Sequence, residues 1–123
     1  MDLSYLWIVF AVAFIAWKVY SMRRSPQQMA EIQAAVDAGA VILDVRSPAE
    51  FAGGHLPGAR NVPVGQVGGV MAELKGQTVI VYCASGARSA RAAGKLRSGG
   101  VNVLDLGTFG NGQMLNFDRG SAP

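Results

Sequence analysis

The stretch VIVYCASGARSARAAGKL, residues 79–96, joins an apolar run to an alanine-rich segment and holds the only cysteine of the chain, Cys83. Val, Ile and Tyr favour β-strands, so the run at residues 78–82 predicts a strand. Alanine favours helices, and residues 89–97 accordingly predict a helix that ends near two glycines. The sequence therefore places Cys83 at a strand-to-helix junction, where a reactive thiol is more plausible than inside the strand.

The same alternation of helix and strand extends outward from this stretch. Ser25 and Pro26 predict a helix start, and residues 41–45 are an apolar run typical of a strand buried on both faces. Further expected elements are a helix beginning at Ser47, a short strand at residues 60–62, an amphipathic helix over residues 67–74 and a strand at residues 101–106. The pattern predicts a small α/β domain with a mainly parallel central sheet flanked by helices, whose ligands bind beyond the carboxyl ends of the strands.

The connection that follows Cys83 consists of small residues around Gly86 and ends at Arg88. Small residues let successive backbone N–H groups turn inward and form an anion-binding nest. The positive end of the next helix and the Arg88 guanidinium add to this field, so we expect the thiolate to be favoured and the sulfur to be nucleophilic. The alternative is a small buried core residue, which describes most free cysteines.

The N-terminal segment is the most apolar part of the chain. Residues 3–22 would extend about 30 Å as a helix, which is enough to cross a bilayer. A signal peptide carries basic residues before its apolar core, whereas here the basic residues follow it. We therefore expect a transmembrane helix with a basic flank at residues 1–24 and one domain at residues 25–123. A cleaved signal peptide and a buried core helix are the alternatives.

Charge and cysteine content indicate the compartment and the partners. Lys18, Arg23 and Arg24 follow the apolar run, which favours a single-pass membrane protein whose domain faces the cytoplasm. A single cysteine cannot form an intrachain disulfide, as suits a reducing compartment. The net charge is +3, and residues 1–24 supply +2 of it (three basic side chains against Asp2). The remaining domain is nearly neutral and predicts no nucleic-acid partner.

Several motifs, taken together, resemble the rhodanese family. They lie in the family's order over residues 42–106: Asp44-Val45-Arg46, Glu50-Phe51, GHLPGA at residues 54–59, NVP at residues 61–63, and the cysteine loop in C-x-x-G-x-R form. The resemblance implies a sulfurtransferase in which Cys83 takes a sulfane sulfur from a donor such as thiosulfate and holds it as a persulfide. The sulfur then passes to a thiophilic acceptor such as cyanide or another thiol. The substrate-binding cradle would comprise Ala84, Ser85, Gly86, Ala87 and Arg88, with neither a metal nor a cofactor.

Two other functions compete with this interpretation. Cysteine phosphatases of the same fold resemble C-x5-R, a loop one residue longer than the C-x4-R that ends at Arg88, so the shorter loop suits a sulfur atom better than a phosphate. The second competitor, from a different class, is a catalytically idle rhodanese fold that serves as a membrane-tethered interaction module. The intact combination of thiol, glycine and arginine favours the enzyme.

Residues outside the loop receive more modest roles. Asp44 and Arg46 end the first strand near the same sheet edge, so we expect them to support the cysteine loop by hydrogen bonds or an ion pair. His55, the only histidine, is expected to make a structural hydrogen bond, and Glu50 to cap a helix. Arg91 continues the helix face of Arg88, where a basic stripe either steers an anionic donor or is simply solvated.

The end of the chain departs from the family pattern. The family commonly has Gly-Gly after the last strand and a tryptophan in a closing helix, whereas here Thr108 follows Gly107 and the nearby aromatic residues are Phe109 and Phe117. The sequence therefore leaves the structure of the tail after Gly107 unassigned.

Overall fold

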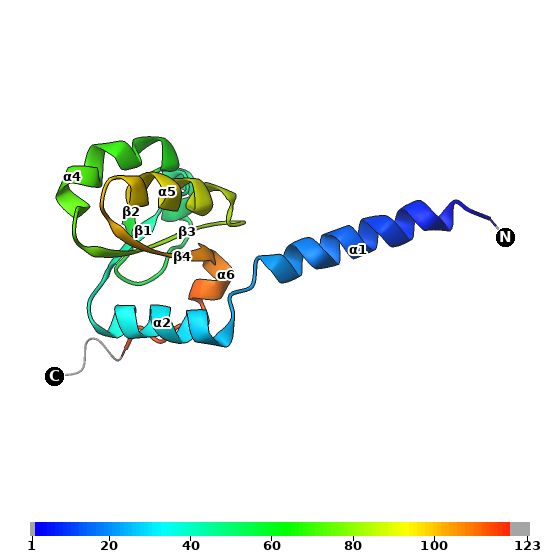
Figure 1. The fold of residues 1–123 in the computed structure, drawn as a ribbon, viewed down its shortest axis with the longest axis horizontal. Helices are drawn as coiled ribbons and strands as arrows, with labels where there is room; N and C mark the ends of the chain where they lie inside the picture. Colours follow the sequence, from blue (N-terminus) through cyan, green and yellow to red (C-terminus); the bar gives the residue numbers. More distant parts are fainter. Residues whose placement is uncertain (1, 119–123) are drawn as a thin grey trace.

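A computed structural model describes residues 2–118 and shows a four-stranded sheet with helices on both faces (Figure 1). The strands are β1 (Val41–Asp44), β2 (Arg60–Asn61), β3 (Thr78–Cys83) and β4 (Asn102–Thr108), in the spatial order β2-β1-β3-β4. The helices are α1 (Tyr5–Ser21), α2 (Pro26–Asp37), α3 (Pro48–Ala52), α4 (Met71–Leu74), α5 (Ala87–Ser98) and α6 (Phe109–Gly112), with a 3-10 helix η1 (Val64–Val70). Every strand pair is parallel, which confirms the expected α/β class.

Side chains of β3 alternate between two apolar cores. Val79, Val81 and Cys83 pack on the face covered by α5, η1 and α4. Ile80 and Tyr82 pack on the opposite face, with α2 and α6. Because successive strand residues point to opposite faces, this alternation directs the Cys83 side chain to the face that carries α5.

Two helix starts follow the local capping signals. Ser25 begins α2 and Ser47 begins α3; each hydroxyl accepts the backbone N–H three residues on, and Gln28 or Glu50 reaches back to the cap. A proline occupies the first turn of each helix, where its missing N–H costs no hydrogen bond. Both starts confirm the sequence predictions.

The amphipathic helix expected over residues 67–74 is wrong in type. The structure has η1 through Val70 and a single α-helical turn from Met71. Glycines at positions 65, 68 and 69 carry a high entropic cost in an α-helix, so the segment adopts a tighter turn and still buries Val67 and Leu74. The expected inward face is therefore correct, while the helix type is not.

The end of the sheet is longer than the sequence predicts. β4 continues to Thr108, and its register shifts where Tyr82 pairs with Gly107, which has a φ of 84°. The left-handed conformation suits glycine. Thr108 then caps α6 by accepting the Asn111 N–H at 3.0 Å. The residue that departs from the family pattern thus starts the closing helix.

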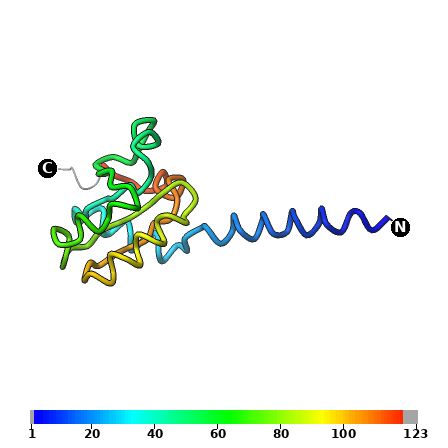
Figure 2. Tube along the Cα trace, turned by 90° about the horizontal axis from the view of Figure 1, so that it is seen from above, coloured from blue at the N-terminus to red at the C-terminus, as the bar shows by residue number. Residues whose placement is uncertain are grey.

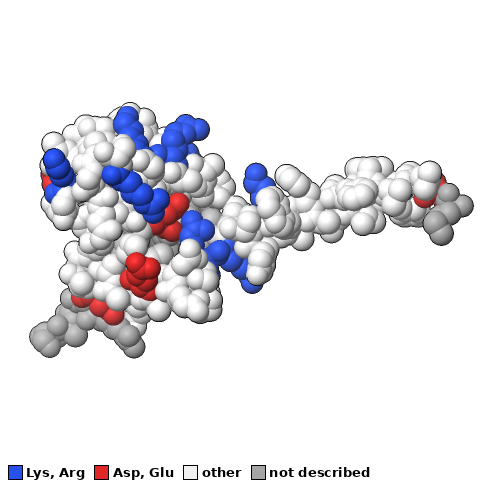
Figure 3. Space-filling model, viewed as in Figure 1, with Lys and Arg blue, Asp and Glu red and all other residues white. Residues whose placement is uncertain are grey.

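Helix α1 extends away from the domain (Figure 2). None of its residues is buried, and its Trp, Phe and Ile side chains are 44–71% exposed. Figure 3 shows basic side chains where α1 meets the domain and uncharged side chains along most of its length. By length and composition this N-terminal helix is a candidate membrane span, a description that a signal sequence also meets. It is not a buried core helix.

Candidate active site

Cys83 is the last residue of β3, and its sulfur is held by backbone donors. Sγ accepts the N–H of Gly86 at 3.0 Å and that of Ser89 at 3.4 Å. Gly86 has a φ of 98°, a conformation that costs other residues about 1–2 kcal/mol, and it turns the chain into α5. The thiol itself is fully buried beneath this turn.

The remaining loop N–H groups are unoccupied by protein. Within residues 2–118, no acceptor is found for the backbone N–H groups of Ala84, Ser85, Ala87 and Arg88. Ala84, Ser85 and Ala87 are exposed, so the loop that carries these donors lies at the surface. The loop also precedes the first turn of the twelve-residue helix α5, whose positive end adds to the field. Such an array of donors is suited to an anion.

Arg88 forms an ion pair beside the loop. Its guanidinium donates to both Glu50 oxygens, at 2.7 and 3.0 Å. The hydrogen bond from Arg88, with those from Ser47, lowers the pKa of Glu50 from 4.5 to about 2, and the same contact raises the pKa of Arg88. Glu50 therefore joins the helix cap to the cysteine loop, a second role that the sequence analysis missed. The available signal was position, because both residues follow the carboxyl ends of neighbouring strands.

Asp44 and Arg46 form a buried ion pair at the neighbouring β1–α3 connection. Arg46 Nε lies 3.0 Å from each Asp44 oxygen, and its Nη2 contacts Asp44 at 2.7 Å and the Gly54 carbonyl at 2.6 Å. Hydrogen bonding to Asp44 raises the pKa of Arg46. These contacts hold the β1–α3 turn and the following loop, so the expected support of the cysteine loop stays a prediction.

Two aromatic rings pack near Arg46, in the core on the opposite face of the sheet from Cys83. The Arg46 guanidinium lies 4.9 Å from the Phe109 ring centre and 5.6 Å from that of Tyr82. Burial raises the pKa of Tyr82, and its hydroxyl accepts the Leu56 N–H at 3.0 Å. Phe109 stacks on Tyr82, with centroids 6.0 Å apart. The closing helix α6 thus packs an aromatic residue, Phe109, against the core on the α2 side of the sheet.

His55 makes structural contacts. Its ring stacks on Phe51 with centroids 3.8 Å apart, and Nδ1 lies 3.0 Å from the Phe51 carbonyl oxygen. Because a carbonyl only accepts, Nδ1 is the donor. The structural hydrogen bond expected of His55 is therefore present.

Ser89 is a site residue that the sequence analysis used only as a helix start. Besides its N–H contact to the sulfur, its hydroxyl donates to the carbonyls of Gly86 at 3.0 Å and Gly107 at 3.3 Å. Arg91, two residues further along α5, is exposed, and no ion pair is found for it among residues 2–118. Ser89 therefore fastens the loop to β4.

A parallel α/β domain with a cradled cysteine at a strand end defines the class of this protein. The sequence profile of the rhodanese-like domain family matches residues 26–110, more than half of the chain, and the chain belongs to this family.

Individual relatives agree with this assignment. The uncharacterized protein YqhL of Bacillus subtilis is 38% identical over 100 residues, which cover 80% of this chain and 79% of YqhL. A sulfurtransferase of Allochromatium vinosum is 40% identical over 68 residues, and the match spans 54% of this chain and 64% of that protein. The structure of the human single-domain sulfurtransferase TSTD1 superposes with a TM-score of 0.54 at 27% identity, over 66% of this chain and 85% of that chain. These findings support a sulfurtransferase-type role.

Proposed function

We propose that this protein is a rhodanese-type sulfurtransferase that carries sulfane sulfur on Cys83. The observation that carries the proposal is the loop itself. Gly86 donates to Sγ, while four further N–H groups have no protein acceptor among residues 2–118. An anionic terminal sulfur in the loop would gain hydrogen bonds from donors that the fold already holds in place.

The reaction would proceed in two half-reactions. The Cys83 thiolate attacks the outer sulfur of thiosulfate, a new S–S bond forms, the bond within thiosulfate breaks, and sulfite leaves. A thiophilic acceptor such as cyanide or a thiolate then attacks the terminal sulfur and releases the Cys83 thiolate. One covalent intermediate separates the steps, so ping-pong kinetics are expected. Because Cys83 is fully buried, donor entry requires movement of the loop at residues 84–88.

Arg88 would bind the donor through charge. Its pairing with Glu50 fixes the guanidinium beside the loop but leaves it about one third exposed. An arginine in this position attracts a dianionic donor while its partner keeps it from folding over the sulfur. The loop remains one residue shorter than that of the phosphatases, which favours sulfur over phosphate as its occupant.

We further propose that α1 spans a membrane and that the domain faces the cytoplasm. The exposed apolar side chains of α1 are unfavourable in water, and a bilayer would bury them on every side of the helix. The basic side chains lie at the end of α1 nearest the domain, as the charge rule requires for this orientation. Recovery of the uncleaved chain in the membrane fraction after an alkaline wash tests the span against a signal sequence.

The activity is tested by thiocyanate formation from thiosulfate and cyanide with the full chain in detergent. The unchanged chain should form thiocyanate, Cys83→Ser should form none, and Ser98→Ala, at the far end of α5, should keep the rate. Equal rates for the chain and for Cys83→Ser would contradict the proposal. Loss of all activity, with no sulfur on Cys83, would favour the idle interaction module instead.

A further inference from the structure

The junction between α1 and α2 is bonded to β4 and to α6. Arg24 Nε donates to the Asp105 carbonyl at 2.8 Å, and its Nη2 lies 3.5 Å from the Asp105 carboxylate. Asn111 Nδ2 donates to the Met22 carbonyl at 3.1 Å and to that of Leu106 at 2.9 Å. The four residues 22–25 are therefore a fastened connection. We call Met22, Arg24, Asp105 and Asn111 the latch.

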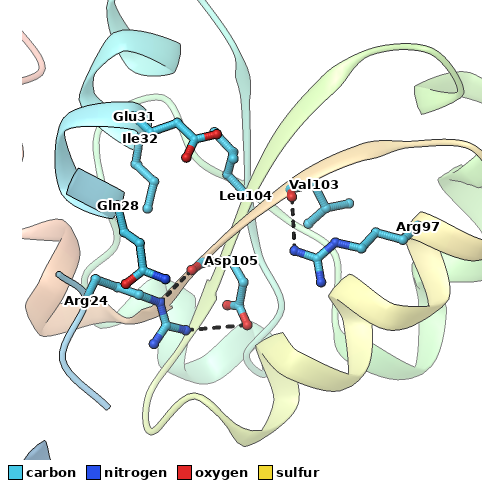
Figure 4. Close-up of a pocket in the computed structure, with 8 residues that line it drawn as sticks. All are labelled: Arg24, Gln28, Glu31, Ile32, Arg97, Val103, Leu104 and Asp105. Atoms are coloured by element: carbon cyan, nitrogen blue, oxygen red, sulfur yellow. Dashed lines mark hydrogen bonds and ion pairs between the residues drawn. The ribbon is translucent and has the colours of Figure 1, made fainter. Parts of the chain in front are cut away.

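Arg24 also closes one end of a cavity beside the outer edge of β4 (Figure 4). On that edge, Arg24 covers the Asp105 carbonyl, and Arg97 of α5 covers the Val103 carbonyl at 3.1 Å. Both guanidinium groups thus occupy acceptors that an added strand would need. The latch sits on a protected edge, and a second copy cannot displace it by simple strand pairing.

The latch is continuous with the cysteine loop. The Asp105 carboxylate accepts the Gly107 N–H at 3.0 Å, and the Gly107 carbonyl accepts the Ser89 hydroxyl at 3.3 Å. Ser89 in turn donates its N–H to Cys83 Sγ. The connection to the apolar helix therefore lies next to the residues that hold the sulfur.

The direction of α1 follows from the same contacts. In both views α1 leaves the domain on the side where the β3–α5 loop lies (Figures 1 and 2). Four connecting residues extend at most about 14 Å. A globular protein of a hundred residues has a radius of gyration of about 13 Å. Such a protein does not fit between the loop and a bilayer that holds α1, whereas a chain segment or a small molecule does.

We propose that the latch turns the cysteine-loop edge toward the bilayer and that the sulfur acceptor is a thiol on a membrane-rooted protein segment. This inference rests on the proposed sulfurtransferase function and on the membrane span. In the transfer, the acceptor thiolate attacks the terminal sulfur of the Cys83 persulfide, the acceptor becomes a persulfide, and Cys83 leaves as the thiolate. No oxidant or reductant is consumed.

The orientation is tested without any activity. In a Cys83→Ser chain, a fluorophore is placed on Ser85→Cys, just past the carboxyl end of β3, or on Gln77→Cys, just before its start. These positions are separated by the length of the strand, about 20 Å. In proteoliposomes, a quencher on lipid headgroups should quench the label at position 85 several-fold more than that at position 77. Equal quenching, or stronger quenching at position 77, would overturn the proposal.

The acceptor is tested with a cysteine peptide coupled to phosphatidylethanolamine and with the same peptide free in solution. The chain is loaded with thiosulfate in vesicles, and persulfide transfer to each peptide is measured. The unchanged chain should transfer sulfur faster to the tethered peptide than to the free one. The double variant Arg24→Ala with Asn111→Ala should show a smaller difference, because a domain released from the latch no longer holds the loop toward the membrane surface. Equal preference in both chains would overturn the inference. Failure to load Cys83 would instead contradict the proposed function.

Discussion

Two strand-to-helix connections lie side by side at the carboxyl edge of the sheet, and they are built differently. In the β1–α3 connection, side chains satisfy the backbone: Asp44 accepts the Arg46 N–H at 2.9 Å, and Ser47 with Glu50 caps the helix. In the β3–α5 connection, residues 84–87 have short side chains, and most of the N–H groups remain open among residues 2–118.

The first connection is built for stability, and the second is built for chemistry. The first connection is closed by its own charged side chains, and the backbone N–H groups of Val45, Arg46 and Ser47 all have acceptors within the protein. The second is open, and among residues 2–118 the acceptor found for its loop N–H groups is the sulfur of Cys83. Changes in the first connection should therefore affect folding, and changes in the second should affect sulfur transfer.

The largest effect is expected in the closed connection. Asp44→Ala leaves the buried Arg46 guanidinium without its partner, which should lower the free energy of unfolding by about 3–5 kcal/mol. Denaturant unfolding of the full chain in detergent measures this. Asp44→Ala combined with Arg46→Met removes both charges and should lose less. A loss below about 1 kcal/mol for the single variant would show that the pair is not buried as described.

In the open connection, Gly86→Ala should mainly reduce activity. A Cβ at a φ of 98° costs about 1–2 kcal/mol and displaces the N–H that contacts the sulfur, so kcat/KM should fall at least about tenfold. The matched control is Gly94→Ala in the middle of α5, where a Cβ meets no atom within 4 Å and should stabilise the helix by about 0.5–1 kcal/mol. Equal activities for the two variants would contradict the proposed role of the loop N–H groups in binding the sulfur.

Removal of the Arg88 charge, which lies between the two connections, should have a smaller effect. Arg88→Ala should raise KM for thiosulfate by roughly two- to fivefold with little change in kcat, the size expected for one exposed charge. Arg91→Ala, on the same helix, should change KM less. Steady-state kinetics at low and moderate salt measure both. An unchanged KM for Arg88→Ala would remove this arginine from donor binding.

The smallest effect concerns pH. The pKa of Glu50 is about 2, below its ordinary value of 4.5, so its pair with Arg88 stabilises the fold above about pH 4.5. That contribution is lost as the pH falls toward 2. Carboxyl NMR of the full chain should show Glu50 ionised at pH 4, and Arg88→Ala should raise its midpoint. A midpoint near 4.5 in the unchanged chain would show that the pair does not form.

Local signals made much of the fold predictable. The sequence predicts helix starts at Ser25 and Ser47 because each capping serine is followed, three residues later, by its capping-box partner. The apolar run before Cys83 placed the thiol correctly, although the strand includes Cys83 itself. The tail was not predictable, because the strand end at Gly107 depends on a register shift against β3.

The missed contacts join distant parts of the chain. Glu50 and Arg88 are 38 residues apart, and Arg24 and Asp105 are 81 apart, so no local pattern reveals either pair. In the sequence, a helix-capping role already accounts for Glu50. Its second contact, with Arg88, therefore leaves no separate signal. The strand order brings β1 and β3 together, and only then do their connections meet.

Cys83 is proposed to carry sulfur in the open connection. The most direct measurement is the intact mass of the full chain after incubation with thiosulfate, followed by peptide mapping. We predict a gain of one sulfur atom on Cys83 that cyanide removes and that Cys83→Ser does not show. An unmodified Cys83 in a folded chain, or sulfur that cyanide cannot remove, would contradict a sulfur-carrying role for Cys83.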